Sequence, residues 1–555
     1  MSRAPTSLGL SVGLALALAW LAGCSGDGSD TGVPSCGDAT WDGFVEPTLT
    51  TWCTPCHSSE LTGDDRRGAP VGTDFDTWAG ANYYANLIAS VAGPGDPYMP
   101  PAGGMPEADR ALLAAWAACD APGPVDEPGP CDVRVEHLGD ATAAGEPCAA
   151  GATAVTGTLT VGSDPGVALD CVCEVDGDLV ITGPVALPLL QRVGGAIRVE
   201  GAGATAVSLP ALATAGSLSI TDAALATLDL SALTAVDAAV FVVRGVLPAT
   251  FEPARLTTVG TTLALRQVDG VTTVDLPRLE SVGEDLVLDG LPALTSVVHT
   301  SDLVTIGGSL RLVNNPALRT VEDFEFVETI GGDLELGGGG DLRSVVALWT
   351  VSRVTGDLTI RDEPRLGSVQ GFESLSQIGG TLRVVSVGAA GVSGFDALDQ
   401  LGGIEVIGNR NLATWATGEV SVVAGSVTVV DNPVLPVLPA IDGVDSIGGA
   451  VQIAGMDALA GGGALGEVVS IPGDLQVVDN AALQNLGMPS LGQVGGDLTL
   501  EQNAALSSLQ GWSALDTVSG DVTVRSNPAL PDAAIGAWLG GIDVGGATTV
   551  DGNGG

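Results

Sequence analysis

Only one short stretch of the 555 residues has residue types and a spacing that define a cofactor chemistry: Trp52-Cys53-Thr54-Pro55-Cys56-His57. Two cysteines separated by two residues and followed at once by a histidine are typical of covalent haem attachment. The two thiols reach the two vinyl groups on one edge of the porphyrin, and the adjacent imidazole is thereby placed beneath the iron. The sequence therefore predicts one haem c, held by Cys53 and Cys56, with His57 as the proximal iron ligand.

A redox dithiol and a zinc site are the other chemistries open to such a cysteine pair. A dithiol is expected in a βαβ context, whereas the hydrophobic periodicity around this pair is helical. Zinc needs two further ligands nearby, and the sequence has no second Cys/His pair at a suitable spacing. The other two histidines, His137 and His299, are isolated in the sequence. Haem is therefore the favoured interpretation.

The elements around the motif are predicted to be helices and one loop. Apolar residues recur at helical spacing from Trp41 to Trp52, a second helix is expected around 83–91, and a third over 107–119. Between the last two lies the loop Met99-Pro100-Pro101. This arrangement resembles a small class I cytochrome c. The resemblance implies that Met99 is the second axial ligand of the iron, with Met105 in the same loop as the alternative.

The chain begins with a short basic segment and an apolar run that ends at a cysteine. Arg3 precedes an apolar run that is too short to span a membrane, so residues 1–23 are interpreted as a signal peptide. The run ends in Leu-Ala-Gly before Cys24, which resembles a lipobox and implies lipidation of Cys24. An ordinary signal peptide with a free cysteine is the alternative. Ser25 in place of Asp favours, by the same resemblance, the outer membrane.

Six cysteines remain after Cys24, Cys53 and Cys56 are assigned, an even number that suits disulfides outside the cytosol. Cys36 and Cys119 bracket the helical unit, and a disulfide between them is a hypothesis. Cys171 and Cys173 lie near the upper limit of disulfide reach for two residues on one face of a strand. Each is therefore expected to pair elsewhere, with Cys131 and Cys148 as plausible partners.

The net charge of −46 and the pI near 4.1 argue against nucleic acid and against an anionic membrane surface as partners. Solubility of an exported protein is the simpler explanation of the charge, and capture of cations or of a basic partner is the other. Residues 24–35 are expected to form a flexible tether, 36–122 the cytochrome-like domain, and 123–130 a Pro/Gly/acidic linker.

The remaining residues, 131–555, repeat a phrase of Gly-Gly-Asp-Leu-x-Leu followed by a polar turn. The key apolar position recurs every 23 or 24 residues, as at Leu286, Leu310 and Leu334. Alternating Leu-x-Leu predicts a short strand, and glycine predicts a tight turn. An asparagine recurs five positions after the key residue, as at Asn480 and Asn503, and stacked copies can form a ladder.

No stretch of the repeat has the helical period that a helix-backed horseshoe requires. We therefore predict a right-handed parallel β-solenoid of roughly 16 coils, about 75 Å long, capped at its start by the cysteine cluster. It resembles the receptor L domain and related leucine-rich β-helices. The Gly-Gly-Asp turns are similar to calcium-binding repeats, but their period differs, so the aspartates are interpreted as turn formers.

The sequence thus predicts a multidomain chain: a small all-α cytochrome c-like domain followed by a long all-β solenoid. The expected function is electron transfer at the bacterial cell envelope with an unidentified redox partner, and an electron carrier is favoured over a catalyst. The alternative is a surface recognition or adhesion lipoprotein whose solenoid binds a protein or a glycan. A haem enzyme or sensor in which Met99 is displaced by a ligand is a third possibility.

Overall fold

The computed structural model describes residues 39–67, 69–70, 73–92, 104–119, 131, 133–142, 148, 150–162, 169–418, 420–439, 441 and 443–555. The chain divides into two compact units, Met1–Gly129 and Pro130–Gly555. In the first unit the described residues form short helices: η1 (Trp41–Val45), α1 (Glu46–Trp52), η2 (Gly63–Arg66), α2 (Trp78–Tyr83), α3 (Ala85–Ala92) and α4 (Glu107–Ala118).

The helices of the first unit enclose a small apolar cluster. Trp116 of α4 is fully buried, and its ring lies 5.8 Å from the ring of Trp41. Leu49 of α1 and Leu113 of α4 are buried in the same cluster. Hydrophobic positions of the first and last helices therefore meet, as their helical periodicity predicts. Cys53 packs against this cluster at its edge.

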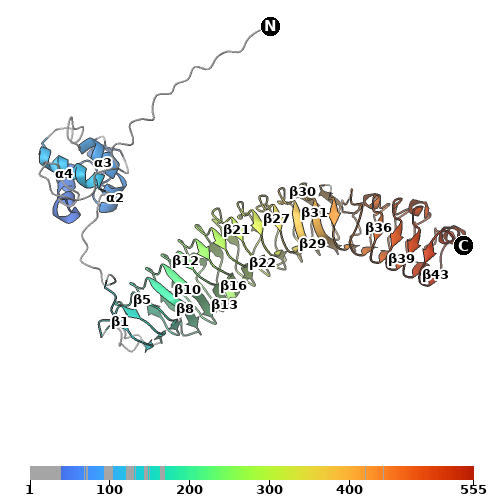
Figure 1. Cartoon of the computed structure of the whole chain (residues 1–555), viewed down its shortest axis with the longest axis horizontal. Coiled ribbons are helices and arrows are strands. Elements are labelled where there is room, and N and C mark those ends of the chain that lie inside the picture. The colour runs from blue at the N-terminus through green and yellow to red at the C-terminus, as the bar shows by residue number, and fades with distance from the viewer. Residues whose placement is uncertain are drawn as a thin grey trace, which may run out of the picture. The chain divides into compact units, whose positions relative to one another are not determined.

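The second unit is a long parallel β-solenoid of about 17 turns, which confirms the predicted architecture (Figure 1). Its main ladder contains, in chain order, β2 (Ala141–Thr142), β4 (Leu159–Val161), β6 (Leu179–Ile181), β8 (Arg192–Glu200), β10 (Thr214–Thr221), β13 (Val240–Val246), β16 (Leu263–Asp269), β19 (Leu286–Asp289), β22 (Leu310–Val313), β25 (Leu334–Gly337), β28 (Leu358–Arg361), β29 (Gln377–Val385), β31 (Gln400–Ile407), β34 (Val427–Val430), β35 (Val451–Ala454), β37 (Leu475–Val478), β39 (Leu498–Glu501), β41 (Val522–Arg525) and β43 (Thr548–Asp551).

Shorter strands form further ladders around the coil. One contains β1 (Glu136–His137), β3 (Ala154–Val155), β5 (Glu174–Val175), β12 (Ala235–Val236), β15 (Thr258–Val259), β18 (Ser281–Val282), β21 (Thr305–Ile306), β24 (Thr329–Ile330), β27 (Arg353–Val354) and β33 (Val422–Val423), with the first residues of β8, β10, β29 and β31 between them. Another contains β36 (Ser470–Ile471), β38 (Gln493–Val494), β40 (Thr517–Val518) and β42 (Asp543–Val544).

The other strands pair in small groups: β7 (Val185–Ala186), β9 (Ala206–Ser208) and β11 (Thr227–Asp229); β14 (Thr250–Phe251), β17 (Thr273–Asp275) and β20 (Ser296–Val298); β23 (Thr320–Val321) and β26 (Ser344–Val345); β30 (Gly391–Phe395) and β32 (Thr414–Thr417). Two 3₁₀ turns, η3 (Gly463–Leu465) and η4 (Gln510–Trp512), and the helix α6 (Asp532–Leu539) interrupt the strands. The described part of the solenoid therefore has no helix of the length that a horseshoe requires.

The repeat phrase sets the register of the main ladder. Leu286 pairs with Leu310, and Leu310 pairs with Leu334, so each key residue stacks on its copy in the next coil. All three side chains are fully buried. The column of leucines is therefore the continuous core of the solenoid, because each coil buries the apolar face of its neighbours.

The glycine and the aspartate of the phrase depend on each other across coils. The Asp497 carboxylate accepts a hydrogen bond from the backbone N–H of Asp521 in the next coil, at 2.8 Å. A Cβ on Gly520 would collide with that same carboxylate and with the backbone of Gly496. The aspartates are thus turn formers, as expected, and the preceding glycine is needed because the aspartate of the previous coil occupies the space of a side chain.

This dependence predicts opposite effects for two glycine substitutions. Gly520→Ala is expected to destabilise the solenoid by about 1–3 kcal/mol through overpacking and loss of the Asp497 hydrogen bond. Gly536→Ala in α6 meets no atom within 4 Å and is expected to stabilise by roughly 0.5–1 kcal/mol. Hydrogen exchange of the peptides that contain each site measures both effects. Equal protection in the two variants would show that the contact across coils is unimportant.

The predicted asparagine ladder lies inside the solenoid. Asn480, Asn503 and Asn527 are fully buried. The Asn503 amide nitrogen donates to the Val477 carbonyl at 2.8 Å, and its amide oxygen accepts from the backbone N–H of Asn480 at 3.1 Å. Each asparagine therefore satisfies buried backbone groups of the turn and also bonds the asparagine of the next coil.

At one coil a carboxylate takes the place of the asparagine. Glu363 is buried, and its two oxygens accept hydrogen bonds from the backbone N–H groups of Gly339, Gly340 and Leu342, at 2.9–3.0 Å. The run of four glycines at 337–340 is the only such run in the sequence. The glutamate thus bonds three backbone N–H groups of the glycine-containing turn in the preceding coil, where three of the four glycines have positive φ.

Candidate functional site

Helix α1 positions the cysteine pair. The helical hydrogen bonds continue beyond Trp52, from the Cys53 N–H to the Leu49 carbonyl and from the His57 N–H to the Cys53 carbonyl, at 2.8 and 2.9 Å. Cys53 and His57 are therefore one helical turn apart and lie on the same side of the backbone. Cys56 follows Cys53 by three residues, so the two thiols and the imidazole come from a single turn.

The imidazole of His57 is oriented by a segment that the sequence did not single out. Its Nδ1 atom lies 2.8 Å from the Thr73 carbonyl oxygen, so Nδ1 carries the proton and donates. Phe75 stacks on the ring face, with 4.7 Å between centroids and 22° between planes. The Phe75 backbone N–H also donates to the His57 carbonyl. Nε2 is therefore the ring nitrogen available to bind a metal, while Nδ1 donates to a carbonyl as in other histidine–metal sites.

A buried arginine holds this segment in place. The Arg66 guanidinium donates to the carbonyls of Ser58 and Pro70, each at 2.7 Å, and pairs with the Asp74 carboxylate at 2.6 Å. Thr73 and Phe75 flank Asp74, so the ion pair fixes the two residues that contact His57. No sequence motif marks Arg66, and its role follows only from the folded structure.

A second carboxylate fixes the turn that follows His57. Asp76 accepts hydrogen bonds from the Ser59 backbone N–H and from the hydroxyls of Ser58 and Ser59, at 2.7–3.0 Å. Burial alone raises the pKa of Asp76, but these hydrogen bonds outweigh it and hold the pKa below its usual value. Hydrogen bonds therefore fix both the segment that contacts the imidazole and the turn that follows His57.

Cys53 and Cys56 carry free thiols, whereas the described cysteines of the solenoid are paired. Both thiols are half-buried. Burial, and to a smaller degree the neighbouring Cys56, raises the pKa of the Cys53 thiol to about 11. Without a cofactor Cys53 is thus a protonated, weakly nucleophilic thiol at neutral pH, which does not suit a redox dithiol, since such a site needs a lowered pKa.

This pKa predicts slow alkylation of Cys53 in protein made without haem-attachment machinery. The shift from 9.0 to about 11 leaves roughly a hundredfold less thiolate at pH 8 than in an unshifted cysteine. Labelling with iodoacetamide across pH 7–11, read by peptide mass, is expected to show Cys53 lagging behind a cysteine peptide and catching up as the pH approaches 11. Equal rates at pH 8 would contradict the burial of this thiol.

Of the two methionines predicted near the iron, Met99 lies outside the described residues. Met105 is buried in the same apolar cluster as Leu49 and Phe75. Gly104 has positive φ, and a Cβ there would lie 3.2 and 3.3 Å from two ring carbons of Trp52. The end of the methionine loop therefore packs against the residue that precedes Cys53. This keeps Met105 open as an axial ligand.

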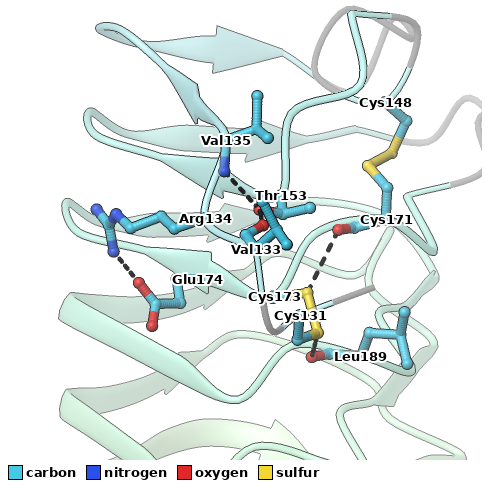
Figure 2. The surroundings of a disulfide bond; sticks show 10 residues. All are labelled: Cys131, Val133, Arg134, Val135, Cys148, Thr153, Cys171, Cys173, Glu174 and Leu189. Carbon is cyan, nitrogen blue, oxygen red and sulfur yellow. Dashed lines mark hydrogen bonds and ion pairs between the residues drawn. A yellow bond between two sulfur atoms is a disulfide. The ribbon is translucent and has the colours of Figure 1, made fainter. Parts of the chain in front are cut away.

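The disulfides of the solenoid lie at its first coils (Figure 2). Cys131 pairs with Cys173, and Cys148 pairs with Cys171, with Cα separations of 5.6 and 5.5 Å. This is one of the arrangements that the sequence left open. Cys119 is also disulfide-bonded. Cys36, its predicted partner, and Cys24 lie outside the described residues, so that pairing and the lipidation stay predictions.

His299, which is isolated in the sequence, is exposed on the solenoid. Its Nδ1 atom lies 2.9 Å from an Asp275 carboxylate oxygen. The hydrogen bond and the charge of Asp275 raise the pKa of His299. Among the described residues no group of three or more His, Cys, Asp or Glu side chains is arranged to hold a metal ion.

Comparison with known proteins adds no family to these observations. No protein-family model matches the chain, and no curated protein matches it. Within the described residues no helix combines the length and the apolar character needed to cross a membrane. The cysteine pair and His57 are therefore the best-defined candidate site, on the geometry of this chain alone.

Proposed function

We propose that the first unit is a monohaem c-type cytochrome domain and that the protein carries electrons at a bacterial cell envelope. The observation that supports this most strongly is the orientation of His57, whose Nδ1 donates to the Thr73 carbonyl and leaves Nε2 as the ring nitrogen that can bind a metal. A histidine that is oriented through Nδ1 and directly follows two free thiols fits a covalently held haem.

The residues present have separate roles in this proposal. Cys53 and Cys56 would form the two thioethers, and His57 would bind the iron through Nε2. Met99 is the proposed sixth ligand, with Met105 as the alternative. Thr73, held by Arg66 and Asp74 next to it, orients the imidazole. The bound haem would supply a reversible one-electron couple. Because protein side chains would fill both axial positions, such a haem would favour electron transfer over binding of an external ligand.

The remaining parts of the proposal concern location. The signal-like residues 1–23 and the lipobox-like sequence before Cys24 support an exported lipoprotein, anchored by its N-terminal lipid in the outer membrane. The solenoid would then serve as a spacer or as a docking module for a partner. Its strongly acidic composition suits a soluble extracytoplasmic domain.

A second candidate function places the activity in the solenoid. A surface groove of about 780 Å³ runs across its coils between residues 364 and 479, lined by side chains that include Arg410, Asn411, Asp431 and Asp479. Such a polar groove favours recognition of a protein or glycan, with the haem domain as an accessory. This is the adhesion or recognition alternative.

An anaerobic redox titration of haem-loaded protein separates these functions. We expect a single one-electron transition, a visible spectrum unchanged by carbon monoxide, and loss of the far-red methionine–iron band in Met99→Ala but not in Met105→Ala. The opposite result for the two variants would assign the ligand to Met105. A spectrum that changes with carbon monoxide would indicate a sensor or enzyme, and a haem that cannot be reduced reversibly would leave the recognition function.

A further inference from the structure

Three aromatic rings connect His57 to the surface of the first unit. Phe75 stacks on the imidazole, with 4.7 Å between ring centroids. Tyr84 meets Phe75 edge-on at 5.9 Å, and Tyr83 meets Tyr84 edge-on at 4.8 Å. Phe75 is buried, whereas 82% of Tyr83 is exposed. The rings thus form a continuous series from the imidazole to solvent.

The segment in which this series ends has no charged residue and exposes three large side chains. Trp78, Tyr83 and Leu87 of the α2–α3 segment are 37%, 82% and 43% exposed. The sequence has no charged residue from Thr77 to Gly95, although the chain as a whole carries a net charge of −46. Large exposed apolar side chains gathered on one segment are typical of interaction sites. Trp78, Tyr83 and Leu87 are called the aromatic face below.

The rest of the unit would steer a partner of defined charge to this face. Arg66, Arg67 and Arg110 are the only basic residues in the sequence between 39 and 119, and Arg66 is already neutralised by Asp74. In the sequence Asp76 precedes the uncharged segment and Asp96 follows it, and ten Asp and Glu residues outnumber the three arginines between 39 and 119. A basic protein is therefore attracted to the unit, while the apolar centre provides the contact that excludes water.

We propose that the aromatic face is the docking surface for a basic one-electron redox protein and that electrons pass between this partner and the haem through Tyr83, Tyr84, Phe75 and His57. This inference rests on the proposed function and adds the route and the partner's chemistry. The donor loses one electron and the haem iron gains one; no bond forms and no proton moves. The rings stay neutral, and they serve as a closely packed path through which tunnelling decays less steeply than through gaps.

Zinc-substituted cytochrome c is a suitable probe, because it is a basic protein whose photo-excited state donates one electron. Full-length, haem-loaded protein in detergent is mixed with the probe, and two quantities are measured: the dissociation constant of the complex, by calorimetry, and the rate of excited-state quenching within the saturated complex. The calorimetric constant does not depend on electron transfer. Visible spectra of all variants confirm that His57 ligation is intact.

Three variants separate docking from the route. Tyr83→Ala removes the outermost ring and apolar contact, Tyr83→Phe keeps the ring, and Leu87→Ala removes contact on the same face without touching the series. We expect weaker binding in Tyr83→Ala and Leu87→Ala, but a several-fold slower quenching rate within the complex only in Tyr83→Ala. Tyr83→Phe is expected to keep the wild-type rate, and added salt to weaken binding in every variant.

The outcomes distinguish this inference from the proposed function. If wild-type protein holds no covalent haem, both fail together. If the haem spectrum is normal but Tyr83→Ala transfers electrons within the complex as fast as Leu87→Ala, the route through the rings is wrong. If neither alanine variant weakens binding, the aromatic face is not the docking surface, although the chain can still be a cytochrome.

Discussion

Replacing Asn503 with leucine is expected to destabilise the C-terminal coils of the solenoid severely. The side chain is fully buried, and its loss removes the hydrogen bond to the Val477 carbonyl and leaves the backbone N–H and one side-chain N–H of Asn480 unsatisfied. Each buried group left unsatisfied costs about 1–3 kcal/mol, so the two N–H groups predict a loss of roughly 2–6 kcal/mol. Leucine has a similar volume, which means that a cavity would not explain the effect.

Hydrogen exchange read by peptide mass is the appropriate measurement, because a long repeat array does not unfold as one unit. Peptides that contain 475–503 are expected to lose protection, while those before residue 300 keep it. Asn411→Leu is the matched control, since Asn411 is exposed and makes one long hydrogen bond of 3.3 Å to Gly388. Similar protection in the two variants would show that the ladder contributes little.

Replacing His57 with alanine is expected to abolish the six-coordinate low-spin spectrum of the haem-loaded protein completely. The thioethers at Cys53 and Cys56 would still hold the haem, but the iron would lose its proximal ligand and become high-spin. Free imidazole in the buffer is expected to restore the low-spin spectrum, since it can occupy the space that the side chain leaves. Absorption spectra with increasing imidazole measure this rescue.

His299→Ala is the control for this prediction, because His299 lies on the solenoid and pairs with Asp275. Its spectrum is expected to match that of the wild type. A low-spin spectrum that survives in His57→Ala without imidazole would mean that another side chain binds the iron. That result would remove the role assigned to Nε2 of His57.

The solenoid could be predicted because the residue types of its repeat are compatible with few structures. A period of 23 or 24 residues fixes the stacking of Leu286 on Leu310, and buried asparagines can only be satisfied by a ladder. The sequence did not show why each glycine precedes each aspartate, since the steric conflict involves the carboxylate of the previous coil. Glu363 in the asparagine column also escaped prediction, because its partners are backbone groups.

The candidate site could be predicted only in part. The motif identified Cys53, Cys56 and His57, because covalent attachment dictates their spacing. The residues that orient the imidazole, Thr73 and Phe75, act through a backbone carbonyl and a ring face, and neither leaves a signature in the sequence. Arg66 also has no signature in the sequence. An arginine among acidic residues suggests a surface ion pair, whereas in the structure Arg66 is buried and donates mainly to backbone carbonyls.

The central claim is that Cys53 and Cys56 bind one haem covalently. Its most direct test is the intact mass, with the reduced absorption spectrum, of wild-type protein and of the Cys53→Ser/Cys56→Ser variant, both matured in a host with haem-attachment machinery. We predict that the wild type gains the mass of one haem that denaturation does not remove, and that the variant does not. Wild-type protein that stays haem-free and can be alkylated at both Cys53 and Cys56 would contradict the account.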